Sequence, residues 1–273
     1  MKPIALLLSL FLSFFASRAF ATDPDYYLLM EKSDKAIAEG HWTEAEDALR
    51  QALRLEPANP SNILLLSNLG MIQFYDGRSD DAIATLTMAH RMAPNSVTVL
   101  QNRAKVYNST GMIDQARMDY DQVIRLDSTL IEPRFYRAMI SLHQGNFAAA
   151  DSMVRTIEQM APSSRLANAG RGLLYMSKAE FANAVPCLTS VIKDDPDPSY
   201  IGSRAFCYLM LGELGQASED IARAIELDPT DGELYLYRAM LNKMRYRPDD
   251  AQADADRARQ FGVSAQTIDR LLK

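Results

Sequence analysis

A small residue recurs along this chain at intervals of 37, 34, 34, 34, 33 and 34 residues, at Ser33, Gly70, Ala104, Ala138, Gly172, Ala205 and Ala239. An alanine follows each of them after twelve residues, which gives a second series with the same spacing: Ala45, Ala82, Ala116, Ala150, Ala184, Ala217 and Ala251. The tetrapeptide Tyr-Arg-Ala-Met at 136–139 returns at 237–240, three periods later. This double periodicity indicates tandem units that bury their apolar sides against their neighbours.

Each period has the pattern of two helices joined by a turn. Apolar residues follow helical spacing around the first small residue, and a break comes about seven residues later. The break often holds a glycine, which readily takes the positive φ of a helix end: Gly40, Gly77, Gly111, Gly145 and Gly212. A second helix then ends near a proline, which cannot continue it: Pro57, Pro94, Pro162, Pro196 and Pro229. The two small-residue series therefore lie on facing antiparallel helices.

These features resemble the tetratricopeptide repeat family, whose pattern is W-x2-L-G-x2-Y…A-x3-F…P. The second period carries the resemblance at Leu66, Leu69, Gly70, Ala82, Leu86, His90 and Pro94. Three positions depart from the pattern. Ser128 replaces the usual proline of the third period, and the turns of the fifth and seventh periods hold Ala179 and Tyr246.

The resemblance implies an all-α fold, a right-handed superhelical solenoid of about seven helix-turn-helix repeats. The solenoid is expected over residues 22–265, with repeats at approximately 26–59, 63–96, 97–130, 131–164, 165–197, 198–231 and 232–265. A C-terminal helix over 264–273 is expected to cap the array, with Ser264 as its N-cap.

Residues 1–21 have the composition of a cleavable signal peptide. Lys2 precedes the apolar stretch IALLLSLFLSFFA, and Ala19 and Ala21 occupy the small-residue positions of a cleavage site. We therefore expect cleavage after Ala21 and export to a bacterial periplasm or to the exterior. An uncleaved N-terminal anchor is the alternative. No later segment is apolar for long enough to span a membrane, so no integral span is expected after cleavage.

The charge and the motif content argue against several function classes. The net charge is −6, and loss of Lys2 and Arg18 with the leader makes the chain more acidic, which disfavours nucleic-acid and anionic-membrane partners. Phosphate-loop, dinucleotide-binding and Gly-x-Ser-x-Gly motifs are missing. The histidines, His41, His90 and His143, share no metal-ligand spacing. We expect no enzymatic activity, cofactor or metal.

An arginine precedes the small residue in the last five periods: Arg103, Arg137, Arg171, Arg204 and Arg238. Three of these have an aspartate sixteen residues later, in the pairs Arg103/Asp119, Arg204/Asp220 and Arg238/Asp254. Sixteen residues cross the turn and return along the facing helix, so each pair is expected to meet inside its own repeat, where the planar guanidinium suits a carboxylate. An arginine ladder that binds an acidic ligand is the alternative.

The resemblance also implies where a ligand would bind, because the family uses the first helix of each repeat, on the concave side. The corresponding positions hold Asn68, Met71, Tyr75, Asn102, Lys105, Phe135, Tyr136, Met139, Phe206, Tyr237 and Met240. Amide side chains pair with a peptide backbone, while methionine and aromatic residues adapt to apolar side chains. We interpret this surface as a peptide-binding groove. For any single residue, packing between neighbouring first helices is the alternative.

The carboxylate clamp by which some family members bind chaperone tails is not predicted here. Asn68 matches its central asparagine, but Met30, Asp34 and Thr98 occupy flanking positions that the clamp fills with basic or amide side chains. Asp34 would repel a carboxylate.

Cys187 and Cys207 are the two cysteines, and export into an oxidising compartment would allow a disulfide between them. The alternative is that both are small buried apolar side chains.

Two functions remain after these exclusions. The first is a protein-interaction scaffold that binds peptide segments in the cell envelope, with partner and oligomeric state unknown. The second is an exported helical protein that binds or processes carbohydrate, with Trp42 and the groove aromatics as sugar platforms. The second would need exposed rings beside paired carboxylates, whereas the first needs only the repeat surface.

Overall fold

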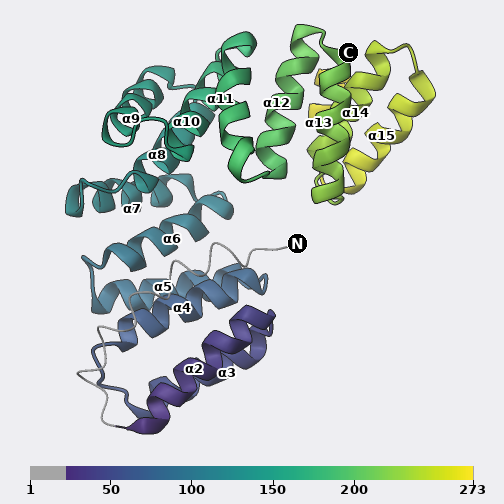
Figure 1. Cartoon of the computed structure of the whole chain (residues 1–273). Helices are drawn as coiled ribbons and strands as arrows, with labels where there is room; N and C mark the ends of the chain where they lie inside the picture. The colour runs from purple at the N-terminus through teal and green to yellow at the C-terminus, as the bar shows by residue number, and fades with distance from the viewer. Residues whose placement is uncertain (1–22, 273) are drawn as a thin grey trace. The chain divides into compact units, whose positions relative to one another are not determined.

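The computed structural model describes residues 23–272, which form fifteen α-helices without any strand (Figure 1). The leader proposed for residues 1–21 lies outside the described residues. The chain divides into two compact units, with the boundary between Pro133 and Arg134. Each unit is a series of antiparallel helix pairs, so the all-α solenoid expected from the sequence is confirmed.

The N-terminal unit holds three helix pairs. Their bounds are α2 (Pro24–Glu39) with α3 (Trp42–Leu55), α4 (Asn62–Tyr75) with α5 (Ser79–Met92), and α6 (Val97–Ser109) with α7 (Ile113–Leu126). We call the first member of each pair a first helix and the other a second helix. Neighbouring pairs pack through the second helix of one and the first helix of the next, as α3 does on α4 and α5 on α6.

The C-terminal unit continues the same arrangement. Its helices are α8 (Glu132–His143), α9 (Phe147–Met160), α10 (Arg165–Ser177), α11 (Phe181–Asp194), α12 (Pro198–Leu211), α13 (Leu214–Leu227), α14 (Gly232–Met244), α15 (Pro248–Gln260) and α16 (Ala265–Leu272). The short α16 packs on α14 and α15. Ser264 caps α16 as expected, because its Oγ accepts a hydrogen bond from the Thr267 N–H at 3.1 Å.

The turn inside each helix pair contains one residue with positive φ, as the glycine spacing predicts. Five of these residues are glycines, and the other two are Ala179 with φ 58° and Tyr246 with φ 57°. A side chain with a Cβ is strained in this conformation. The fold therefore imposes the turn even where the sequence lacks a glycine.

Small residues let the two helices of a pair approach closely. A Cβ added to Gly70 on α4 would lie 2.6 Å from the Leu86 Cγ on α5, a distance that real Cβ atoms do not show. The same contact recurs in α10 and α11, where a Cβ on Gly172 would lie 3.1 Å from Leu188. Both glycines belong to the first small-residue series, and its members are fully or almost fully buried.

Candidate functional site

Three of the five arginines that precede the first small residue bind aspartates across the helix pair. Arg103 on α6 donates to both carboxylate oxygens of Asp119 on α7, at 2.7 and 2.8 Å. The same bidentate contact joins Arg204 to Asp220 at 2.8 and 2.7 Å, and Arg238 to Asp254 at 2.9 and 2.6 Å. The three aspartates are 5–6% exposed, so these ion pairs lie inside the helix pairs.

An aromatic ring covers the guanidinium in most of this column. Tyr107, Tyr175 and Tyr208 each lie four residues after the arginine, and their ring centroids are 5.6–5.7 Å from the guanidinium carbon. The carboxylate and the aromatic ring therefore both compensate the charge of the buried guanidinium. This arrangement leaves little of Arg103, Arg171 and Arg204 for an acidic ligand, and it favours the structural interpretation for these three arginines.

Arg171 has no aspartate sixteen residues later, because that position holds Cys187. Its guanidinium turns to α9 of the preceding pair instead, where it donates to Asp151 at 2.7 Å and to both oxygens of Glu158 at 2.8 and 2.6 Å. Burial acts to raise the pKa of Asp151, but the hydrogen bond from Arg171 and the nearby Arg155 outweigh it, and the pKa is lowered. Arg171 thus links two helix pairs.

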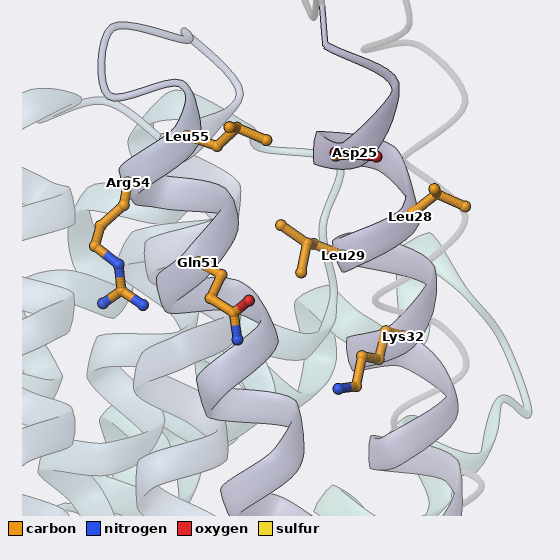
Figure 2. A pocket seen from close by; sticks show the side chains of 7 residues that line it. All are labelled: Asp25, Leu28, Leu29, Lys32, Gln51, Arg54 and Leu55. Carbon is orange, nitrogen blue, oxygen red and sulfur yellow. The ribbon is translucent and has the colours of Figure 1, made fainter.

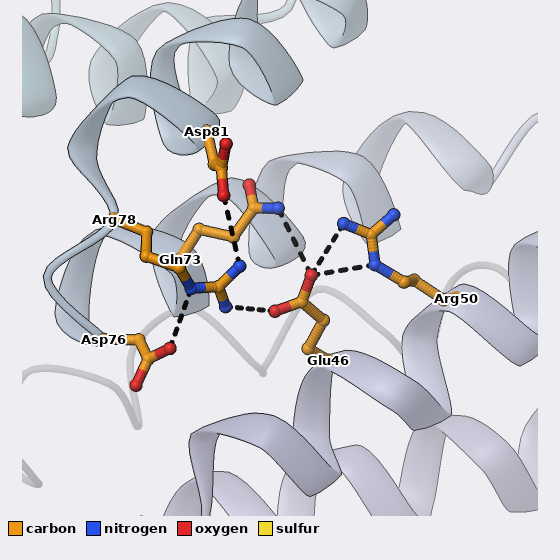
Figure 3. Close-up of polar contacts among 6 residues, drawn as sticks. All are labelled: Glu46, Arg50, Gln73, Asp76, Arg78 and Asp81. Atoms are coloured by element: carbon orange, nitrogen blue, oxygen red, sulfur yellow. Dashed lines mark hydrogen bonds and ion pairs between the residues drawn. The ribbon is translucent and has the colours of Figure 1, made fainter.

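A second link joins the first two helix pairs around Glu46 on α3, which is only 7% exposed (Figure 3). Arg50 donates to its Oε1 at 2.8 and 2.6 Å, and Arg78 from the α4–α5 turn donates to Oε2. Burial acts to raise the pKa of Glu46, but the hydrogen bonds from Arg78 and Arg50 outweigh it and lower the pKa. Arg78 also binds Asp76 at 2.8 Å and Asp81 at 3.3 Å.

The sequence contains a signal for these two links that the spacing of the small residues does not show. Glu46 and Asp151 each follow an alanine of the second series, and each has an arginine four residues later, Arg50 and Arg155. In both cases a further arginine arrives from the next helix pair. An acid at this position therefore marks a charged link between successive repeats.

The proposed groove residues divide into two groups in the structure. Five are buried, at 2–9% exposure, and so pack between helices: Asn68, Met71, Asn102, Phe135 and Met240. Asn102, for example, donates to the Ser67 Oγ at 2.9 Å inside the N-terminal unit. These five residues therefore have the packing role that was the alternative to ligand binding. The other six are partly exposed: Tyr75, Lys105, Tyr136, Met139, Phe206 and Tyr237.

Three partly exposed aromatic rings contact one another in series in the C-terminal unit. The Phe206 ring on α12 lies 5.4 Å from the Tyr237 ring on α14, and Phe181 at the start of α11 lies 5.9 Å from Phe206 on its other side. Burial, with Glu233 nearby, raises the pKa of the Tyr237 hydroxyl, so the ring carries a neutral phenol. We call Phe181, Phe206 and Tyr237 the aromatic row.

Two exposed methionines extend this surface. Met210 follows Phe206 by one helical turn and is 49% exposed, and Met244 follows Tyr237 by two turns and is 43% exposed. Both therefore lie on the side of their helices that carries the aromatic row. Exposed thioethers beside partly exposed rings give an apolar and adaptable surface.

Trp42, proposed as a sugar platform, has one ring face packed against another aromatic residue. Its ring stacks on Tyr75 with centroids 5.8 Å apart and an interplanar angle of 25°, and both rings pack against the core of the first two helix pairs. One face of the indole is therefore covered by a protein ring.

The disulfide considered for Cys187 and Cys207 is not formed, and both thiols are free. Cys187 is half-buried on α11, where its Cβ faces Gly172 of α10, while Cys207 is fully buried on α12 among Leu188 and Ile192. Burial raises the pKa of the Cys207 thiol to about 11. Cys207 is thus the small buried side chain of the alternative interpretation, whereas Cys187 is only partly buried.

Within residues 23–272, no group of three or more His, Cys, Asp or Glu side chains is arranged to hold a metal ion. None of the helices described is long and apolar enough to cross a membrane.

Comparisons with known proteins identify the family. Two tetratricopeptide repeat profiles match consecutive segments, residues 30–97 and 97–130. A crystal structure of a tetratricopeptide repeat protein from Parabacteroides merdae superimposes with a TM-score of 0.74 at 27% identity, over 92% of this chain and 98% of that one. This chain belongs to the tetratricopeptide repeat family, whose fold supports a role as a protein-interaction scaffold.

Two further similarities concern larger proteins. Cellulose synthase operon protein C of Escherichia coli K12 is 23% identical over 234 residues, which are 82% of this chain and 19% of that protein. This chain thus spans only about a fifth of the length of that relative. The Cut9–Hcn1 hetero-tetramer of the APC/C shares the fold, with a TM-score of 0.69 at 14% identity, over 98% of this chain and 57% of that one.

Proposed function

We propose that this chain is a scaffold of the cell envelope that binds a peptide segment of a partner protein along α12 and α14. The observation that carries the proposal is the pairing of Phe206 and Tyr237 on neighbouring first helices, with rings 5.4 Å apart and neither ring fully buried. First helices are the elements on which the family binds its ligands.

The chemistry of this surface favours apolar side chains of the partner. Met210 and the aromatic row offer rings and a thioether, and the hydrogen bond from the Tyr237 hydroxyl to Glu233, at 3.4 Å, satisfies the polar end of the ring. An apolar side chain placed between Met210 and Phe206 would bury surface that is now wet. Interfaces commonly draw most of their binding energy from a few such aromatic contacts.

The envelope location rests on the leader-like residues 1–21, which lie outside the described residues. If the leader is removed after export, the folded repeats would meet partners in the periplasm or outside the cell. The Cut9–Hcn1 assembly illustrates that this fold occurs within multi-protein complexes.

The geometry gives less support to the carbohydrate alternative. Sugars stack on flat, open ring faces, but Phe181 meets Phe206 at an interplanar angle of 76° and Tyr237 meets it at 44°. The rings therefore form no flat platform, and one face of Trp42 is covered by Tyr75. The similarity to a protein of a cellulose synthase operon is the remaining reason to include glycans in the test.

The test is site-specific photo-crosslinking in the native cells, with the full chain carrying a photoreactive residue at position 210. Met118, which is 63% exposed on the second helix α7, is the matched control position. We expect position 210, and not position 118, to capture one or two envelope proteins. Capture of nothing at position 210, together with glycan binding by the purified chain, would exclude the proposal.

Binding energetics provide the second arm. Phe206→Ala should weaken binding of the captured partner about tenfold or more, because truncating an interface aromatic typically costs at least 1 kcal/mol. Phe147, 38% exposed at the start of the second helix α9, is the matched control. Equal affinity for the two variants would place the binding surface elsewhere.

A further inference from the structure

The outer face of α2 carries apolar residues that are buried in other first helices. Leu28 and Leu29 lie five and four residues before the small residue Ser33, and equivalent pairs lie before Gly70, Ala104 and Ala239. Those equivalents are 0–7% exposed, namely Leu65, Leu66, Val99, Leu100, Leu234 and Tyr235. Leu28, in contrast, is 59% exposed.

Leu234, the equivalent of Leu28 in the last helix pair, packs on the preceding pair. Leu234 shows the contact directly, since its Cδ2 would lie 2.7 Å from a Cβ on Gly202 of α12. In the described residues no helix pair precedes α2, so the same packing face is left open there. Leu28 thus has the residue type of an interface without its partner, whereas Leu29 is partly buried against the core of the first helix pairs.

Figure 2 shows this open face between α2 and α3. Leu29 points toward α3, where Gln51 and Leu55 complete a cavity of about 570 Å³, and Leu28 points away from α3. Asp25 and Lys32 complete the α2 side of the cavity. The exposed surface is therefore an apolar centre with Asp25 and Lys32 along α2 and a second base, Arg54, on α3.

These two charges are symmetric about the leucines. Asp25 and Lys32 are seven residues apart, close to two helical turns, and the midpoint between them falls between Leu28 and Leu29. A second α2 packed antiparallel about that midpoint would set Asp25 of each copy opposite Lys32 of the other, with the leucines in the centre. This is the self-complementary arrangement that a two-fold interface requires.

We propose that a second copy of this chain covers the outer face of α2, in a head-to-head dimer with a two-fold axis between Leu28 and Leu29. Lys32 forms an exposed contact with Glu44 at 3.4 Å, which is a weak competitor for the contact between the two copies. The dimer buries the open leucines and pairs both charges twice.

The other end of the repeat series explains why the assembly closes at two copies. Helix α16 covers α14 and α15, with Ile268 only 3% exposed and packed among Tyr235, Ala255 and Ala258. A head-to-tail contact would need that end to be open. Helix α16 therefore stands in the way of a heterologous stack in which α2 of one copy packs on α14 and α15 of another.

Sedimentation equilibrium of the full chain, expressed with its leader and purified, tests the inference. We expect a dimer that Leu28→Glu dissociates about a hundredfold more readily, because the change places two carboxylates in the apolar centre. Met118→Glu is the matched control, since Met118 is equally exposed but lies on α7. A monomeric wild-type chain, or equal effects of the two variants, would overturn the inference.

Charge reversal tests the antiparallel register. Asp25→Lys alone and Lys32→Asp alone should each weaken the dimer about tenfold, since each replaces two attractive contacts by repulsive ones. The double variant should restore the wild-type dimer. Failure of the double variant to restore it would refute this register, and a monomer whose mass shows residues 1–22 still attached would assign the face to that segment instead.

Thermal unfolding of each variant separates loss of the dimer from loss of the fold. Asp25 and Lys32 are exposed, and the helix N-cap is Asp23 rather than Asp25, so the variants should keep the helical content of the wild-type chain. A dimer that persists unchanged in Asp25→Lys would also contradict the proposal.

Discussion

Arg171 on α10 binds Asp151 on α9, in the preceding helix pair, at 2.7 Å. Its counterparts Arg103 and Arg204 bind aspartates within their own pairs instead. The difference follows from one residue, because Cys187 occupies the position where the repeats of Arg103 and Arg204 have the aspartate. A thiol does not compensate the guanidinium charge, so the arginine turns to the acids of the neighbouring repeat.

Removing Asp151 should therefore uncouple two repeats. A double-mutant cycle with Asp151→Asn and Arg171→Met should give a coupling energy of about 1 kcal/mol or more in the free energy of unfolding, measured by urea denaturation. The same cycle between Asp151 and Arg204, which share no contact, should give a coupling close to zero. A coupling indistinguishable between the two cycles would contradict the link.

Arg204→Ala should lower the thermal stability of the chain. The side chains of Arg204 and Asp220 are 15% and 8% exposed, and removing one member of a buried pair leaves the other charge unpaired, at a cost of about 3 kcal/mol. We expect the melting temperature of the Arg204→Ala variant to fall by several degrees. Arg223→Ala on the exposed side of α13 is the control, and equal melting of the two variants would show that Arg204 is not a structural residue.

Replacing both members of that pair should do less harm than replacing one. Arg204→Met combined with Asp220→Leu removes both charges from a site enclosed by protein, and such apolar replacements are often neutral. We expect the double variant to recover at least half of the stability that Arg204→Ala loses. A double variant less stable than the single one would mean that the charges stabilise the repeat beyond their mutual compensation.

Tyr246→Gly should stabilise the last helix pair. Tyr246 has φ 57° in the turn between α14 and α15, and its side chain is 94% exposed, so no packing is lost on truncation. Glycine removes the steric cost of the left-handed conformation, about 1 kcal/mol. Tyr246→Ala, which keeps the Cβ, is the control in the same chemical denaturation series. If Tyr246→Gly and Tyr246→Ala stabilise the chain equally, the gain comes from removal of the ring and not from relief of backbone strain.

Asp34 predicts a pH dependence of stability. Burial on α2, with Glu31 nearby, raises the pKa of this carboxyl to about 6, above its value in an unfolded chain of about 3.9. A folded-state pKa above the unfolded value means that the stability contributed by the neutral acid is complete below about pH 4 and is lost as the pH rises through 6.

Asp34→Asn should therefore stabilise the chain at pH 8 by about 1 kcal/mol, a value reduced for partial solvent exposure, and should have little effect at pH 4. Lys35→Gln, an exposed neighbour on the same helix, is the control in paired urea titrations at the two pH values. An equal effect of Asp34→Asn at both pH values would contradict the shifted pKa.

The sequence by itself determined the structure inside each repeat. The two small-residue series, the turn glycines and the prolines after the second helices are local signals, and the sixteen-residue spacing brings Arg238 and Asp254 together because a short turn fixes the return of the chain. Helical periodicity and turn length are enough to place these residues, so the fold could be predicted without any tertiary information.

Only the tertiary structure decided what happens between repeats. The partners of Arg171, the burial of Asn68 and Phe135, and the separate environments of the two thiols depend on how one helix pair packs on the next. The exposure of Leu28 likewise depends on the absence of a preceding pair among the described residues. Contacts within a repeat are set by local geometry, whereas contacts between repeats depend on packing angles that a repeating sequence pattern does not encode.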